Sequence, residues 1–393
     1  AMTLQAGGAV TQTQPATTTS FNVTTTSGGV TMGNTGNKLG TLSAKVSTAG
    51  AALTVANDGQ LQIGQVSTQG PVTISTVNGG NVVIGPAVTP SAKLQTTGAV
   101  NFTGVAGNVI MSNNGTIVAP GGVTMPSGKR IQWSLTSSAD SGVGSLRDTL
   151  QTINAIKAPS QISYGAPATI KLASALPTVL VPLTIQGNNA LTLDGTAAGA
   201  TASGLAFDSK AAGSSVSGIT FQNFGQAGVW LSGAAGSTVT GITVTNSLYG
   251  LLATGALAAG TTKSVVTSST FTGNGQGAYL NASGISFGLA GQGNNITGSA
   301  TSSSGITMTG VLTGTTVQGN SIRQTPTAFF ISAATGATVG GTGSGQFNYV
   351  EYATNGVFAT GTCTGTSIVK MAWGPGVTTR YNTSGARGLS IVP

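Results

Sequence analysis

Carboxylates are scarce in this chain, and that limits the acid–base chemistry it can perform. The whole acidic inventory is Asp58, Asp140, Asp148, Asp194, Asp208 and Glu351. Hydrolysis of a glycosidic bond usually needs two carboxyl groups about 5 to 9.5 Å apart. Only Asp194 and Asp208, 14 residues apart, have a spacing close to one coil of a repeat protein. Asp194 also falls in a Leu-Asp-Gly turn, where Asp has a structural reason to occur.

The chain has few residues suited to other kinds of catalysis or to metal binding. The chain has no histidine, which excludes Ser–His and Cys–His nucleophiles and His-based metal sites. A polysaccharide lyase would need clustered acids for Ca²⁺ and a nearby basic residue, and no such cluster occurs. The single cysteine, Cys363, cannot form an internal disulfide and is expected to be a small buried hydrophobe. We therefore expect no catalytic residue, no metal and no cofactor.

Composition defines the class of protein. Charged residues make up 5% of the chain, against about 25% in ordinary globular domains, so Thr, Ser, Asn, Gln and Gly must cover the surface. The net charge of +8 is scattered, and Lys129–Arg130 is the only adjacent basic pair, so no nucleic-acid site is indicated. No apolar run reaches the roughly 18 residues of a membrane helix. We expect a monomer with no membrane span.

A short sequence motif repeats along the chain from residue 215 onward. A Thr–apolar pair is followed by an asparagine and then by an apolar cluster led by Gly or Ala. The asparagines recur at intervals of 21 to 28 residues: Asn223, Asn246, Asn274, Asn295, Asn320 and Asn348. A period in this range, with short β-type runs and no helical pattern, is typical of a solenoid. The predicted fold is an all-β, right-handed parallel β-helix.

The alternation within each repeat predicts what lies inside the coil and what lies outside. In residues 218–223 and 241–246, apolar and polar side chains alternate with period 2, as in strands with one buried face. Stacking successive coils then gives an outward polar strip: Thr220, Gln222, Thr243, Thr245, Thr270 and Thr272. Hydroxyl and amide groups repeating at about 4.8 Å are able to hydrogen-bond a glycan chain. The strip is equally compatible with an inert solvated face.

Two further sets of side chains are assigned to the interior. The six repeat asparagines are expected to close the strands at a bend and to bond their equivalents in neighbouring coils as an internal ladder, the alternative being solvated turn formers. The aromatic residues of the clusters are expected in the core rather than as platforms for sugars. They are Trp230, Tyr279, Phe329, Phe330 and Phe358.

The first third of the chain has its own pattern. Apolar triplets alternate with Gly and Asn turns at spacings near 10 and 20 residues, which indicates two or three strands per coil. The triplets are residues 30–32, 53–55, 61–63, 72–74, 82–84, 100–102, 109–111 and 123–125. The run 28–42, with 53–57 and 61–64, resembles the repeats of filamentous-haemagglutinin-like large exoproteins. That resemblance implies a Gram-negative surface adhesin exported by type V, usually two-partner, secretion.

Residues 129–195 have the most distinctive sequence in the chain. Ser145 precedes Leu146, Leu150 and Ile153, which lie on one helical face, so a short helix near 145–155 is predicted with Ser145 as its N-cap. The Gly-Ser-Leu-Arg-Asp-Thr-Leu run at 144–150 resembles the sequence that opens right-handed β-helix domains of polymorphic outer-membrane-type surface proteins, with Thr149 replacing the usual Ala. We expect this helix to cap an open end of the solenoid.

These patterns predict three segments and one function. Residues 1–125 are expected to form haemagglutinin-like coils, 126–160 a connecting strand and the capping helix, and 161–393 a pectate-lyase-like β-helix. We expect a fragment of a longer secreted or cell-surface protein, a non-catalytic adhesin or structural stalk. Its expected partners are a host or neighbouring cell surface, a matrix protein or a glycan, and an outer-membrane translocator during export. The alternative is a carbohydrate-binding or carbohydrate-cleaving β-helix, either a lyase or a glycoside hydrolase.

Overall fold

The computed structural model describes residues 1–85, 92–111, 115–255, 262–299 and 301–392. Apart from one α-helix and one short 3₁₀ turn, its regular elements are β-strands, and the pairings between them are parallel. The predicted all-β parallel β-solenoid with a single short helix is confirmed. Contacts divide the chain into two compact units, Ala1–Ser137 with Ser141–Ser163, and Ser138–Asp140 with Tyr164–Pro393. No helix among the described residues is long and apolar enough to cross a membrane.

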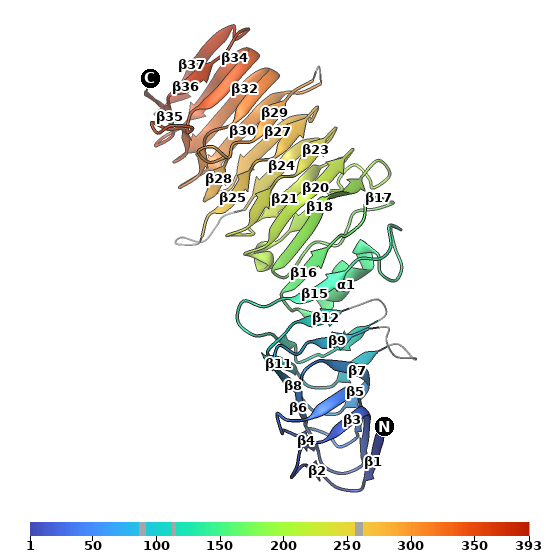
Figure 1. Cartoon of the computed structure of the whole chain (residues 1–393). Helices are drawn as coiled ribbons and strands as arrows, with labels where there is room; N and C mark the ends of the chain where they lie inside the picture. The colour runs from blue at the N-terminus through green and yellow to red at the C-terminus, as the bar shows by residue number, and fades with distance from the viewer. Residues whose placement is uncertain (86–91, 112–114, 256–261, 300, 393) are drawn as a thin grey trace. The chain divides into compact units, whose positions relative to one another are not determined.

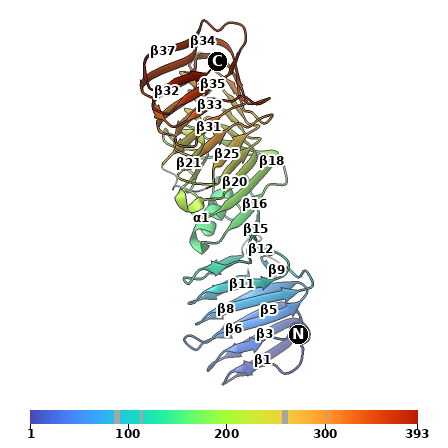
Figure 2. The ribbon, with the colours of Figure 1, turned by 90° about the vertical axis from the view of Figure 1, so that its left-hand side faces the viewer.

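In the first unit, strands of successive coils pair in parallel and form three columns (Figure 2). The first column contains β1 (Met2–Ala6), β3 (Thr17–Thr25), β5 (Lys38–Val46), β7 (Leu61–Thr68), β10 (Lys93–Thr96) and β13 (Thr116–Val118). The second contains β2 (Val10–Thr11), β4 (Val30–Met32), β6 (Leu53–Asp58), β8 (Val72–Val77), β11 (Val100–Val105) and β14 (Val123–Thr124). The third runs from the first half of β7 through β9 (Val82–Ile84), β12 (Val109–Met111), β15 (Ile131–Ser134) and β16 (Ser160–Ser163). Each predicted apolar triplet therefore falls wholly or partly in a strand.

The predicted helix is present as α1, Leu146–Ile156. The Ser145 side chain accepts a hydrogen bond from the Asp148 amide at 3.2 Å, which satisfies one of the free N–H groups of the first turn. Leu150 and Ile153 are fully buried. The strands on either side of the helix, β15 and β16, pair directly with each other, so the helix is inserted within a coil.

In the second unit each coil contributes strands to three columns (Figure 1). The first column contains the start of β18 (Leu183–Asp194), the start of β20 (Ser215–Gln222), β22 (Thr238–Thr240), β25 (Ser264–Thr267), β28 (Ile285–Phe287), β31 (Thr316–Val317), β33 (Thr338–Gly340), β35 (Ser367–Val369) and β38 (Ser390–Val392). The second contains β17 (Ala168–Lys171), the ends of β18 and β20, β23 (Thr243–Thr245), β26 (Thr270–Thr272), β29 (Asn295–Thr297), the starts of β32 (Ser321–Thr335) and β34 (Asn348–Thr362), and β36 (Met371–Trp373). The third contains β19 (Leu205–Phe207), β21 (Ala227–Ser232), β24 (Tyr249–Thr254), β27 (Gln276–Asn281), β30 (Ser304–Val311), the ends of β32 and β34, and β37 (Thr379–Arg387). The 3₁₀ turn η1 (Ser209–Ala211) follows β19.

The interior of the second unit is a continuous stack of apolar side chains. Phe221 lies in register with Val244, and Val244 with Phe271, all of them fully buried. The Phe271 ring stacks on Phe287 from the first column at 5.8 Å between centroids. Near the start of β24 there is no room for a side chain, since a Cβ on Gly250 would come within 2.4 Å of the Phe271 ring. Cys363 is buried, as predicted.

A buried asparagine ladder exists, but only part of it was predicted. Asn320 and Asn348 are almost fully buried, and the Asn320 side-chain amide donates to the Asn348 Oδ1 at 2.9 Å. The third member is Asn294, whose amide donates to the Asn320 Oδ1 at 3.0 Å. The predicted member Asn295 is wrong, because its side chain points outward in the second column. These asparagines occupy the bend that precedes the second-column strands, where each Oδ1 also accepts a backbone N–H of the preceding coil.

The remaining predicted ladder residues lie at the other end of the same strands. Asn246 is exposed with φ 52°, and Asn223 is half-buried with φ 60°, so both are turn formers in the left-handed region and the ladder assignment is wrong for them. Asn274 is buried, and it lies one residue further from the end of its strand than Asn223 and Asn246 do. Its Oδ1 accepts from the Ser247 amide at 2.9 Å and its Nδ2 donates to the Val244 carbonyl at 3.0 Å. Among the described residues, the Asn274 side chain thus bonds backbone groups and not another asparagine side chain.

Candidate functional site

The predicted polar strip forms on the second column of the second unit. Thr220 pairs with Thr243, and Thr243 with Thr270, while Gln222, Thr245 and Thr272 form the parallel row. All six side chains are half-buried or exposed, and the residues between them point inward. The structure thus brings the six predicted residues together in register. Their role in binding stays a prediction.

The two rows of the strip continue beyond the predicted residues. In one row Thr169 and Thr192 precede Thr220, and Asn295 and Ser321 follow Thr270. The side chains of this row are small and uncharged, so this part of the face is flat. The other row carries charge near its ends, because Lys171 lies beside Asp194 and Arg323 beside Glu351.

The charged end of the strip at β32 and β34 is held by three side chains. Arg323 Nε lies 3.8 Å from Glu351 Oε1, and the Tyr349 hydroxyl donates to Glu351 Oε2 at 3.0 Å. That hydrogen bond, with the negative charge of Glu351, raises the pKa of Tyr349 above its usual value. Glu351 is therefore engaged by one residue of its own strand, Tyr349, and by one of the neighbouring strand, Arg323.

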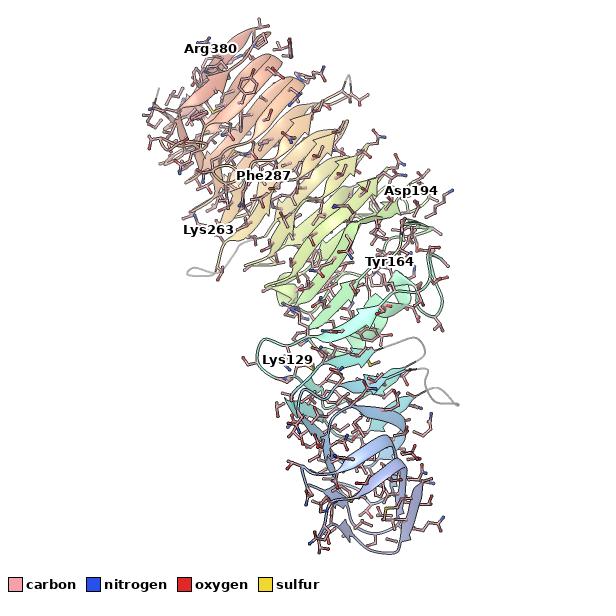
Figure 3. All side chains as sticks on the ribbon, viewed as in Figure 1. Lys129, Tyr164, Asp194, Lys263, Phe287 and Arg380 are labelled. Carbon is pink, nitrogen blue, oxygen red and sulfur yellow. The ribbon has the colours of Figure 1, made fainter. Side chains whose placement is uncertain are left out.

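Asp194 closes a turn at the other end of the strip, at the edge of the coils in Figure 3. Its Oδ1 accepts from the Thr196 hydroxyl at 2.6 Å, from the Thr196 amide at 3.0 Å and from the Asn223 side chain at 3.2 Å. The Thr196 hydroxyl contributes most, and with the other donors it outweighs partial burial and lowers the pKa of Asp194 to about 2. A carboxyl group held ionised in this way is a poor general acid at neutral pH.

Asp208 occupies a separate turn. It is the N-cap of η1, and its Oδ1 accepts from the Lys210 amide at 2.7 Å. Asp194 and Asp208 share no hydrogen-bond partner in the part of the chain that the structure describes. Asp194 and Asp208 therefore each accept hydrogen bonds within their own turn.

The third column presents an aromatic face that was not predicted. Phe329 is fully buried, as expected. The assignment to the core is wrong for Trp230, Tyr279, Phe330 and Phe358, which are half-exposed and point outward. We call the outward row of this face the aromatic column: Trp230, Leu252, Tyr279, Thr307, Phe330 and Phe358.

Two contacts organise the aromatic column. The rings of Phe330 and Phe358 stack with centroids 5.7 Å apart and planes inclined by 12°. The Trp230 indole donates to the Thr254 hydroxyl at 2.8 Å. The signal for this face was present in the sequence, since the third position of each apolar cluster alternates with two buried neighbours.

A groove of about 420 Å³ opens on the aromatic column. We call it the aromatic groove, lined among others by Gln276, Ser304, Thr307, Phe330, Asn355 and Phe358. Its volume lies in the range of about 300 to 1,000 Å³ that is usual for small-molecule sites. Within the described residues, no group of three or more His, Cys, Asp or Glu side chains lies close enough to hold a metal ion.

Comparison with known proteins adds one finding. Residues 184–370 match the family model described as periplasmic copper-binding protein (NosD). The match begins in β18 and ends after β35, so it covers most of the second unit and just under half of the chain. The coils of this unit are therefore NosD-like. No curated protein matches the chain in sequence.

Proposed function

We propose that this protein is exported and acts at the cell surface as a non-catalytic adhesin or structural stalk. The observation that carries the proposal is the polar strip, because coils in strict register repeat neutral hydroxyl and amide groups along one face. Such a face offers many weak and equivalent contacts, which gain strength when many copies are displayed. The resemblance of residues 28–64 to haemagglutinin-like repeats supports the same function.

The description of the matched family raises the question of copper, and this chain's residues do not fit that metal. Copper sites in proteins draw on imidazole, thiolate and thioether ligands. The chain has no histidine. Cys363 is buried in the core with its thiol 3.5 Å from the Thr360 carbonyl. Met32, Met111 and Met308 are buried, and the other three methionines, Met2, Met125 and Met371, lie in different coils. We therefore carry over from this family the coil architecture and an exported location, and not the metal.

The carboxylates also support a non-catalytic role. Asp194 and Asp208 cap separate turns, and Glu351 bonds Tyr349. Asp58 accepts from the Asn78 side chain at 2.7 Å. Catalysis by a carboxyl pair would require one member to be free to exchange a proton with substrate, and these four acids are engaged in turns or bonded to neighbouring side chains. The expected partners remain a cell surface, a matrix protein or a glycan.

Adhesion of protein-coated beads tests the proposal directly. Beads carrying the full chain should bind to cells, matrix proteins or immobilised glycans, and the triple variant Thr220→Val, Thr243→Val, Thr270→Val should bind at least fivefold less. The matched control replaces outward threonines of the first column, Thr238→Val, Thr316→Val, Thr338→Val, and should bind like the wild type. A polysaccharide panel assayed for new reducing ends and unsaturated products completes the test. Turnover lost in Asp194→Asn or Asp208→Asn would replace the adhesin with an enzyme.

A further inference from the structure

The aromatic column has one short side chain among large ones. Tyr279 pairs with Thr307, and Thr307 pairs with Phe330, so the threonine lies between two rings that belong to coils two steps apart. Two steps correspond to about 9.6 Å at the usual spacing of about 4.8 Å between strands. The Tyr279 ring tilts toward Tyr249, with centroids 5.4 Å apart. Thr307, which is only 4% exposed, lies at the floor of the aromatic groove beside these rings.

One wall of this space is a flat aromatic surface. Phe330 stacks one face on Phe358 in the next coil, so its opposite face is directed toward the coil of Thr307. A flat ring in contact with that face needs about 3.5 to 4.0 Å between carbon atoms. Phe330 is half-buried, so part of its ring is accessible from the aromatic groove, and a ring bound there would stack on that part.

The polar groups of the groove are neutral, and one buried oxygen among them lacks a hydrogen-bond partner. Ser304 and Thr307 bond each other through their hydroxyls at 2.7 Å and form a satisfied floor. The Gln276 side-chain oxygen is buried without a hydrogen-bond partner among the described residues. A primary amide offers two donors and an acceptor, and its terminal torsion turns easily. Gln276 and Asn355 thus place amide groups beside the flat wall, with no charged residue in the lining.

We propose that the aromatic groove is a subsite for one pyranose ring of a neutral glycan. The apolar C–H face of the sugar stacks on Phe330, and its rim hydroxyls bond the amides of Gln276 and Asn355. A sugar ring joins an apolar face to a rim of donors and acceptors, which is the combination that this groove presents. An anionic glycan would find no cation in the lining to offset the loss of water around its charge. This inference rests on the proposed adhesive function and names the partner for it.

Binding of defined oligosaccharides tests the groove. Cellohexaose, xylohexaose and mannohexaose serve as neutral probes, and hexagalacturonate is the anionic probe, each titrated calorimetrically into the full chain. At least one neutral probe should bind in the millimolar range or tighter, and hexagalacturonate at least tenfold more weakly. Phe330→Ala should weaken binding by tenfold or more, and Asn355→Ala by about fivefold. The control Trp230→Ala removes an outward ring of the same column outside the groove lining and should stay within twofold.

A second variant separates loss of the site from loss of fold. Thr307→Phe places a ring in the aromatic groove and should abolish binding, but it also removes the hydroxyl that bonds the buried Ser304. Asn355→Leu, at a half-buried position of the same lining, is the variant that should lose binding while the melting temperature is kept. If no neutral probe binds, or if Phe330→Ala and Thr307→Phe bind like the wild type, the subsite does not exist. Beads that still adhere to cells in that case would leave the adhesive function standing without this groove. Loss of matrix-protein binding in Phe330→Ala without any oligosaccharide binding would overturn the sugar in favour of a peptide ligand.

Discussion

The two ends of the polar-strip strands both use asparagine, for different purposes. At the start of β29, β32 and β34, the asparagines Asn294, Asn320 and Asn348 are buried and bond one another from coil to coil. At the end of β20 and β23, Asn223 and Asn246 turn the chain with positive φ and remain accessible to solvent. The difference shows that one residue type closes a coil either by supplying hydrogen bonds inside or by adopting a backbone conformation outside.

The largest expected effect comes from breaking the ladder. Asn320→Leu leaves the Asn294 amide and the Asn348 Oδ1 without a side-chain partner, and it frees the Phe287 carbonyl that now accepts from Asn320 Nδ2 at 2.9 Å. Buried groups left unpaired cost about 1 to 3 kcal/mol each, so we expect a loss of about 3 kcal/mol in the free energy of unfolding. Urea unfolding followed by tryptophan fluorescence measures it. A loss below about 1 kcal/mol would mean that water replaces the ladder.

Glycine substitutions sharpen the comparison, because glycine supplies conformation without hydrogen bonds. Asn246→Gly should keep the stability of the wild type, whereas Asn246→Ala should cost about 1 kcal/mol, since a Cβ disfavours the left-handed region. Asn320→Gly should cost as much as the leucine variant. The same urea experiment applies to all three. Equal losses in Asn246→Gly and Asn246→Ala would show that the Asn246 side chain forms bonds that matter.

Much of this architecture follows from the sequence. Period-2 alternation placed Thr220 over Thr243 and Thr270 correctly, because a strand with one buried face has only one register that keeps apolar residues inside. The same reasoning failed for the pair Asn294–Asn295, where a choice that is wrong by one residue moves the side chain to the opposite face. No pattern in the sequence states which of two adjacent asparagines is inside.

The aromatic groove was missed for a different reason. Aromatic residues were assigned to the core by type, although Phe329 and Phe330 are adjacent and must point to opposite faces. Aligning the clusters by position would have put Phe330 in one outward row with Trp230 and Tyr279. The shape of the aromatic groove depends on how its rings are oriented, and ring orientation is a property of packing in three dimensions.

The smallest expected effect is the pH dependence of stability that arises from Asp194, at the solvent-exposed end of the second-column strands. The pKa of Asp194 is about 2 in the folded protein, below its usual value near 3.8, because Thr196 and Asn223 donate to the carboxylate. Stabilisation by the ionised form is therefore fully present above about pH 4 and is lost as the pH falls through about 2. Since the group is largely exposed, we expect about 0.5 kcal/mol.

Melting temperatures of the wild type and Asp194→Asn, compared at pH 2, 3, 4 and 6, measure the stabilisation by the ionised Asp194 carboxylate. The variant should be slightly less stable at pH 6 and equal to the wild type at pH 2. The cost of Asn320→Leu should stay constant over the same range, because the ladder contains no titrating group. A pH-independent difference for Asp194→Asn would mean that its neutral amide loses hydrogen bonds to Thr196 that do not depend on charge. The solvated turn would then resemble the buried ladder in mechanism, and the contrast between the two ends would be one of burial alone.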